Sequence, residues 1–208
     1  LVLPAGQALS RQYRHPTFSA VDVYRPVTKW AARAHSVDEL PELMARAYHA
    51  MRTGKGGPVL IEVPAEVWEA EFTGDLDYEP VPAYRAAPDP DAVRQAAQML
   101  LAAENPVLWA GQGVLYAEAS DQLIALAELV PAPVVATNPG KSAFPENHPL
   151  ACGSSTRSGP RMLFEFLARA DLVFAIGSSL TRTPFGPGVP PGKLIVHSTN
   201  DPDDVNKD

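Results

Sequence analysis

The sequence is poor in cysteine, in positive charge and in long apolar segments, and each shortage excludes a class of protein. Its single cysteine, Cys152, excludes a disulfide framework and a cysteine-rich zinc site. No apolar run reaches the roughly 18 residues of a membrane-spanning helix, so we expect no membrane partner. Asp and Glu number 24 against 17 Lys and Arg, which gives a net charge of −7. Without a basic tract to offset that charge, we expect no nucleic-acid partner either.

The length and the ends of the chain set its class. With 208 residues, 46% of them hydrophobic, the chain can bury a sizeable core. It carries no secretory signal peptide, so a cytoplasmic location is predicted. Residues 1–7 read as the end of a buried strand, and an orphaned strand leaves unpaired backbone groups. We therefore expect a piece of a longer protein; the alternative is a complete small protein with a processed amino terminus.

The first segment, residues 1–72, reads as a partial α/β domain. Residues 23–30 alternate in polarity and predict an edge strand that Pro26 breaks. Ser36 and Glu39 form a predicted capping box for an amphipathic helix that ends near Gly54. Residues 56–64 contain a continuous apolar run, typical of a buried parallel strand. Residues 73–88, rich in proline and acidic residues, are predicted to be an extended linker.

The second segment, residues 89–208, alternates strands and helices. Asp89 and Pro90 predict the start of a helix, whose buried face we expect at Val93, Ala97, Leu100 and Leu101. Further helices are predicted over 117–130 and 160–169, and strands over 106–110, 133–137, 172–176 and 194–196, with a short one near 151–153. This order predicts an α/β fold with a parallel sheet covered by helices on both faces, as in Rossmann-like domains.

Three of the predicted strands end in glycine, which allows a ligand to approach the backbone closely. Because ligands of parallel sheets bind beyond the carboxyl ends of the strands, Gly111, Gly140 and Gly177 suggest a nucleotide-sized cleft. Two familiar motifs are incomplete, however. Tyr116 stands where the dinucleotide fingerprint needs its third glycine, and Val135 where a P-loop needs its first. The five histidines show no metal-ligand spacing and no catalytic triad is evident, so we assign this chain no catalytic and no metal-binding residue.

A resemblance to a known family rests on a fixed order of motifs. It comprises Pro-Val-Leu-Trp-Ala-Gly-Gln-Gly at 106–113, Gly-Lys-x-x-Phe-Pro-Glu-x-His-Pro at 140–149, a strand ending at Gly177, and His197 followed by Asp201-Pro202. This order resembles the central domain of thiamine-diphosphate-dependent enzymes of the acetolactate synthase type. Residues 1–72 are similar to the carboxyl-terminal part of that family's pyrimidine-binding domain, with Gly6-Gln7, 25–29 and 57–64 in register.

The resemblance implies that the thiamine diphosphate and Mg²⁺ sites are not in this chain. The catalytic glutamate belongs to an earlier part of the first domain, and the Gly-Asp-Gly motif to a third domain; here Gly74-Asp75 continues with Leu76. In such families the central domain holds FAD, holds ADP or CoA, or holds nothing. The residues that match cofactor-contacting positions are Arg25, Gly111, Gly113, Thr137, Gly140, Gly153, Gly159 and Gly177.

Several positions depart from the family pattern. Ser179 replaces an arginine, Thr199 an acidic residue, Ser19 a glutamine and His35 a lysine. These changes suit a divergent member that acts on another 2-keto acid or acyl donor.

The resemblance therefore implies an enzyme piece: part of a thiamine-dependent transferase or lyase that decarboxylates or joins 2-keto acids, as a homodimer or tetramer, inactive by itself. Two alternatives stay open. One is a decarboxylase of oxalyl-CoA or benzoylformate type, and the other is a stand-alone nucleotide-binding module with the same sheet but no such chemistry.

Overall fold

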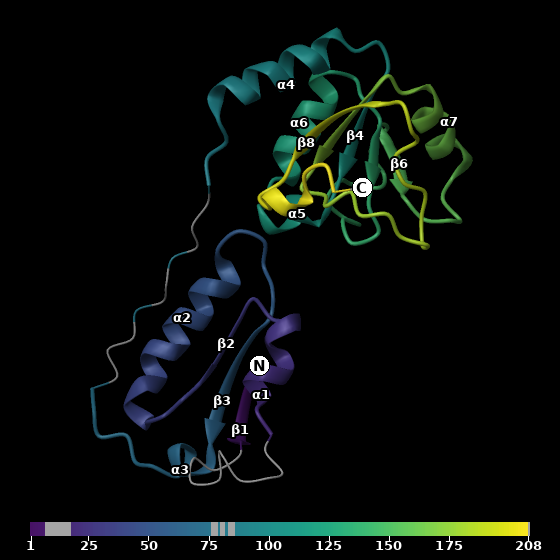
Figure 1. Cartoon of the computed structure of the whole chain (residues 1–208). Coiled ribbons are helices and arrows are strands. Elements are labelled where there is room, and N and C mark those ends of the chain that lie inside the picture. The colour runs from purple at the N-terminus through teal and green to yellow at the C-terminus, as the bar shows by residue number, and fades with distance from the viewer. Residues whose placement is uncertain (7–17, 76–78, 80–81, 83–85, 208) are drawn as a thin grey trace. The chain divides into compact units, whose positions relative to one another are not determined.

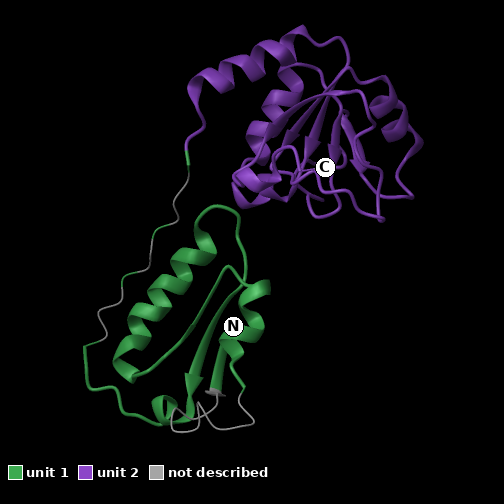
Figure 2. Cartoon of the chain, viewed as in Figure 1, with its two compact units in different colours: residues 1–86 green, residues 87–208 purple. Residues whose placement is uncertain are grey.

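The computed structural model describes residues 1–6, 18–75, 79, 82 and 86–207 (Figure 1). The chain divides into two compact units, Leu1–Ala86 and Ala87–Asp208 (Figure 2), which are called unit 1 and unit 2 below. Both are built on parallel sheets, so the predicted α/β class is confirmed. The assignment of residues 1–72 and 89–208 to particular domains of a larger enzyme stays a prediction.

Unit 1 is a three-stranded parallel sheet in the order β1-β3-β2. Its strands are β1 (Val2–Gly6), β2 (Trp30–Arg33) and β3 (Val59–Pro64). The helix α2 (Leu40–Arg52) covers one face, where Val59, Ile61 and Val63 meet its apolar stripe. The short helix α1 (Ala20–Tyr24) packs on β2 and β3 from the other side of the sheet, and α3 (Ala65–Trp68) follows β3 (Figure 1).

Unit 2 is a five-stranded parallel sheet in the order β6-β5-β4-β7-β8. The strands are β4 (Pro106–Ala110), β5 (Val134–Ala136), β6 (Ala151–Ser154), β7 (Leu172–Ile176) and β8 (Leu194–Ser198). One face is covered by α4 (Pro90–Ala102), α5 (Gln112–Tyr116) and α6 (Ser120–Leu129), the other by α7 (Arg161–Arg169). Helices on both faces explain why most of the strands are buried apolar runs.

Alternate strand residues supply the two halves of the core of unit 2. Leu108, Val134 and Leu172 point toward α4–α6, while Val107, Val135 and Val173 point toward α7. The β-strand period of two dictates this division. The strand predictions over 106–110, 133–137, 172–176 and 194–196 are confirmed within one or two residues.

Two helix ends follow the predicted chemistry. The Asp89 carboxylate accepts hydrogen bonds from the backbone N–H groups of Asp91 and Ala92, at 2.7 and 3.1 Å, and so begins α4. Gly54 follows the end of α2 with a φ of +64°, a conformation that glycine adopts without strain. The predicted capping box does not form: Ser36 makes no capping bond, and Glu39 accepts from the N–H of His35 instead of that of Ser36, at 3.1 Å.

The predicted strand over 23–30 is wrong. The chain there forms α1, then a 3₁₀ turn over Arg25–Val27, and β2 begins only at Trp30. Ser19 causes the difference because its hydroxyl accepts a hydrogen bond from the N–H of Asp22 and begins a helix. The predicted helix over 117–130 is also corrected. Glu118, at a φ of +55°, separates α5 from α6.

The predicted burial is wrong at two elements. On α4 only Leu100 is buried, while Val93, Ala97 and Leu101 are exposed, Leu101 by 75%. The strand β1 is not buried as its opening residues suggest: its first residue, Val2, is 43% exposed and the preceding Leu1 is 65% exposed, because β1 lies at an edge of its sheet.

Candidate functional site

The glycine-marked strand ends of unit 2 lie along one edge of the sheet. In the parallel register, Ala110 at the end of β4 lies beside Ile176 of β7 and Ala136 of β5, and Ile176 lies beside Ser198 of β8. Residues that follow these four positions therefore meet at the same edge. The prediction that Gly111 and Gly177 share an edge is confirmed.

Gly111, Gly113 and Gly177 contact one another directly, and we call these three residues the strand-end clasp. Gly111 donates its N–H to the carbonyl oxygen of Ile176, and Gly113 donates its N–H to that of Gly177, both at 2.8 Å. A Cβ atom on Gly111 would lie 2.2 Å from the Gly177 carbonyl oxygen, and one on Gly177 would lie 2.7 Å from the backbone nitrogen of Val114. Only glycine fits at these positions because two backbone segments pass each other without side chains between them.

Gly140 and Thr137 close the loop after β5 in the same way. Thr137 donates its N–H to the carbonyl oxygen of Ala110 at 2.8 Å, and the N–H of Gly140 reaches both the carbonyl and the hydroxyl oxygen of Thr137 at 3.0 Å. A Cβ on Gly140 would lie 2.6 Å from the Ala110 carbonyl oxygen. This loop is therefore packed onto the end of β4.

Gly153 and Gly159 lie at the other side of the edge, around the end of β6. Gly153 has a φ of +78° and its backbone lies close to the ring of Pro160, and Gly159 donates its N–H to the carbonyl oxygen of Thr156 at 3.0 Å. Both serve the turn from β6 into α7. Arg25 lies exposed in unit 1, so its predicted contact with a nucleotide on unit 2 stays a prediction.

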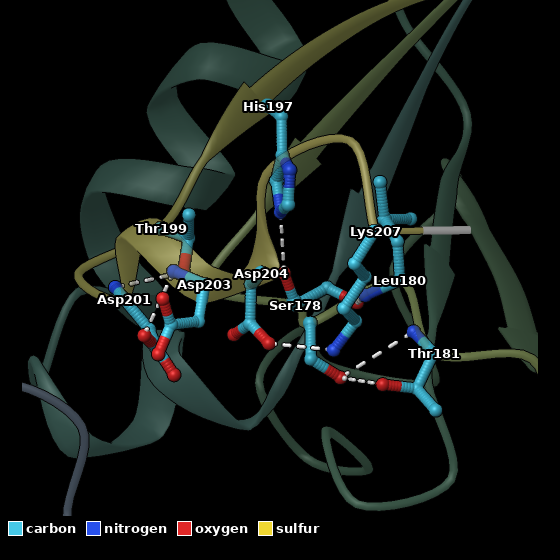
Figure 3. Close-up of polar contacts among 10 residues, drawn as sticks. Ser178, Leu180, Thr181, His197, Thr199, Asp201, Asp203, Asp204 and Lys207 are labelled. Carbon is cyan, nitrogen blue, oxygen red and sulfur yellow. Dashed lines mark hydrogen bonds and ion pairs between the residues drawn. The ribbon is translucent and has the colours of Figure 1, made fainter.

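Side chains fill the edge beyond β7 and β8 (Figure 3). The His197 ring nitrogen Nε2 lies 2.7 Å from the carbonyl oxygen of Ser178, and because a carbonyl only accepts, Nε2 carries the proton. Asp204, 6% exposed, pairs with the Lys207 ammonium at 2.6 Å. Asp201 caps the turn at Pro202–Asp204 by accepting from the N–H of Asp203 at 3.1 Å.

The described residues present little of what a dinucleotide needs. The N–H groups of Gly111, Gly113, Gly140, Gly159 and Gly177 all donate to backbone carbonyl oxygens of the chain. A shallow depression beside β5 and β6, lined by Val134, Phe144 and Gly153 among others, is open to solvent and encloses no ligand-sized cavity. The glycines therefore fit one another, and the fit to FAD or ADP is poor.

Metal binding has no support among the residues that the structure describes. Within residues 1–6, 18–75, 79, 82 and 86–207, no three His, Cys, Asp or Glu side chains gather closely enough to hold an ion. The same part of the chain contains no helix long and apolar enough to cross a membrane.

One buried charged pair was not foreseen. Glu62, on the central strand of unit 1, is fully buried, and its two carboxylate oxygens accept from Arg33 Nε at 3.0 Å and Arg33 Nη2 at 2.7 Å. The two residues are register partners on β3 and β2. The glutamate within a Val/Leu/Ile run is the sequence signal for such a pair, because a carboxylate buried there needs a partner.

Cys152 is expected to be unreactive in the folded protein. Its side chain is buried on β6, and burial raises the pKa of the thiol to about 11. At pH 8 the thiolate, which is the reactive form, is therefore scarce. A chromogenic disulfide reagent should label Cys152 slowly in buffer and fast in urea; fast labelling of the folded chain would contradict its burial.

Because the pKa of the Cys152 thiol is raised in the folded chain, we also expect the free energy of unfolding to fall as the pH rises from 9 toward 11.

The comparisons with known proteins agree with one another. A family model described as "Thiamine pyrophosphate enzyme, central domain" matches residues 93–208. The chain is 34% identical over 209 residues to glyoxylate carboligase of Escherichia coli O157:H7, covering 97% of this chain and 35% of that protein. It is 35% identical over 217 residues to the acetolactate synthase large subunit of Corynebacterium glutamicum, covering 100% of this chain and 34% of that subunit.

A solved structure is also similar. The chain superimposes on benzoylformate decarboxylase from Polynucleobacter necessarius with a TM-score of 0.80 and 30% identity, over 98% of this chain and 39% of that one. The chain thus spans about a third of the length of the curated relatives it matches.

Proposed function

Because the chain belongs to the thiamine pyrophosphate enzymes, whose central-domain model matches residues 93–208, we propose that it forms part of an enzyme that cleaves or joins 2-keto acids next to the carbonyl group. The similarity through both units, over 97% of the chain with glyoxylate carboligase, is the observation that carries this proposal. The names of the relatives, a carboligase, a synthase and a decarboxylase, span bond formation and bond cleavage.

In this proposal the chain is a scaffold. Thiamine diphosphate, when bound, supplies the carbanion-stabilising chemistry of the family. The described residues offer no cluster of ligands for its magnesium ion, so we assign that site to other parts of the enzyme and route no step through this chain. A homodimer or tetramer and a cytoplasmic location belong to the same proposal.

The similar proteins also suggest which substrates this enzyme uses. Small 2-keto acids such as glyoxylate, pyruvate and benzoylformate are the leading candidates, because a glyoxylate carboligase, an acetolactate synthase and a benzoylformate decarboxylase are similar to the chain. No observation among the described residues favours a stand-alone nucleotide-binding module.

The protein from the complete reading frame provides the test. With thiamine diphosphate and Mg²⁺, it should release CO₂ from at least one of pyruvate, glyoxylate and benzoylformate, and lose that activity when the cofactor is removed. The 208-residue chain alone, under the same conditions, should show no turnover above background. Activity in the short chain would overturn the scaffold role, and no activity in the complete protein would overturn the proposed reaction.

A further inference from the structure

We infer that the carboxyl edge of the five-stranded sheet is closed by the chain itself, and that unit 2 binds neither FAD nor ADP there. The inference does not depend on the proposed thiamine chemistry. It concerns only how the residues predicted to contact a nucleotide are used in this structure.

The strand-end clasp occupies the backbone that would receive a phosphate. A glycine-rich strand end binds phosphate through free N–H groups that point away from the sheet. Here Gly113 donates to Gly177 across the gap between two loops, and Gly177 donates to Ser198 in continuation of the β7–β8 ladder, both at 2.8 Å. The missing side chains of these glycines leave room for another loop, because the nearest atoms to a Cβ on Gly113 all belong to Gly177, at 2.7 Å and beyond.

The loop after β5 removes a second set of donors. Thr137 donates its N–H to the carbonyl oxygen of Ala110, and Gly140 donates its N–H to the oxygens of Thr137. Ala143 then donates to the Gly140 carbonyl oxygen at 2.9 Å, which holds the loop in place. A nucleotide would have to break these bonds before it could form its own.

The charge at the β8 side of the edge also opposes a phosphate. Asp201, Asp203 and Asp204 lie within one short turn, with Lys207 paired to Asp204 (Figure 3). This turn brings three carboxylate side chains together beside the Lys207 ammonium group. Because like charges repel, these carboxylates would weaken the binding of a diphosphate placed beside the turn.

One unpartnered donor could argue for a ligand, but it lies elsewhere. Among the described residues, the Trp109 indole N–H is buried without a hydrogen-bond partner. Trp109 belongs to the core on the α7 side of the sheet, together with Val135 and Val173. Its side chain therefore packs on the α7 face of the sheet, opposite to the face covered by α5.

Direct titration tests the inference. ADP and FAD, each added to the purified chain and followed by calorimetry and by flavin fluorescence, should give no saturable signal up to about 1 mM, which corresponds to binding weaker than about 4 kcal/mol. Saturable one-to-one binding of either nucleotide in the micromolar range would overturn the inference. The same titration on the protein from the complete reading frame should give the same result.

Two matched glycine variants test the clasp without any nucleotide. Gly177 and Gly192 both have positive φ, +61° and +78°, but a Cβ on Gly192 would have no atom within 4 Å. Gly192→Ala should therefore lower Tm only by the strain of its backbone conformation, about 2–4 °C. Gly177→Ala should lower Tm by about 10 °C or more, or prevent folding, since backbone atoms must move. Equal effects of the two substitutions would show that the loops are not in contact.

Discussion

Replacing Glu62 by alanine is expected to lower the free energy of unfolding by about 3–5 kcal/mol. The substitution leaves the Arg33 guanidinium, whose side chain is 8% exposed, without its carboxylate partner in the interior of unit 1. A buried charge without a partner is far more costly than the loss of the pair as a whole, because its hydration is not replaced. Urea unfolding followed by circular dichroism measures the change.

An exposed pair in the same unit is the matched control. Glu42 and Arg46 are ion-paired on α2 with side chains about two-thirds exposed, so Glu42→Ala should cost at most about 1 kcal/mol. Replacing Arg33 and Glu62 together by methionine should restore most of the stability, since two apolar side chains need no partners. If Glu62→Ala costs no more than Glu42→Ala, the Arg33–Glu62 pair is not buried as described.

The second large effect is expected at the centre of unit 2. Leu108 is fully buried on β4, in the core beneath α4–α6, and Leu108→Ala should cost about 2–5 kcal/mol. The loss combines the transfer of the removed atoms to water with the cavity left among the helices.

Leu101, on α4, gives the comparison for the same chemical change. Its side chain is 75% exposed, so Leu101→Ala should alter the free energy of unfolding by no more than about 0.5 kcal/mol. Both variants can be followed by urea unfolding at one temperature. A large loss at Leu101 would mean that α4 is covered by something in solution, and a small loss at Leu108 would contradict the core.

The strands could be predicted because each carries its own signal. Buried parallel strands are continuous apolar runs, and β4 and β7 are such runs with glycine or proline at their ends, while Glu62 alone interrupts the run of β3. Short helices carry less signal. The helix α1 depends on one hydroxyl, that of Ser19, and its β-branched residues favoured a strand. The predicted buried face of α4 is wrong because a helical stripe indicates where apolar residues gather and not what covers them.

The sequence predicts where the candidate site lies but not whether its glycines contact a ligand or another loop. Parallel topology fixes which ends share an edge, so Gly111 and Gly177 could be placed together. Sequence alone does not state whether a glycine admits a ligand or another loop, because both need the same missing side chain. Glu62 and Arg33 were missed because their partnership depends on strand order, which the local pattern does not contain.

The exposed apolar side of α4 has a consequence for the evolutionary record of this family. Val93 and Leu101 do not support the core of unit 2, so that core imposes no selection on them. In an alignment of close homologues these positions should drift toward polar residues wherever water is their only neighbour. Apolar residues that persist there would instead indicate that another surface covers α4 in the assembled enzyme. The substitution pattern along this one helix would thus distinguish a solvent-exposed face from an interface.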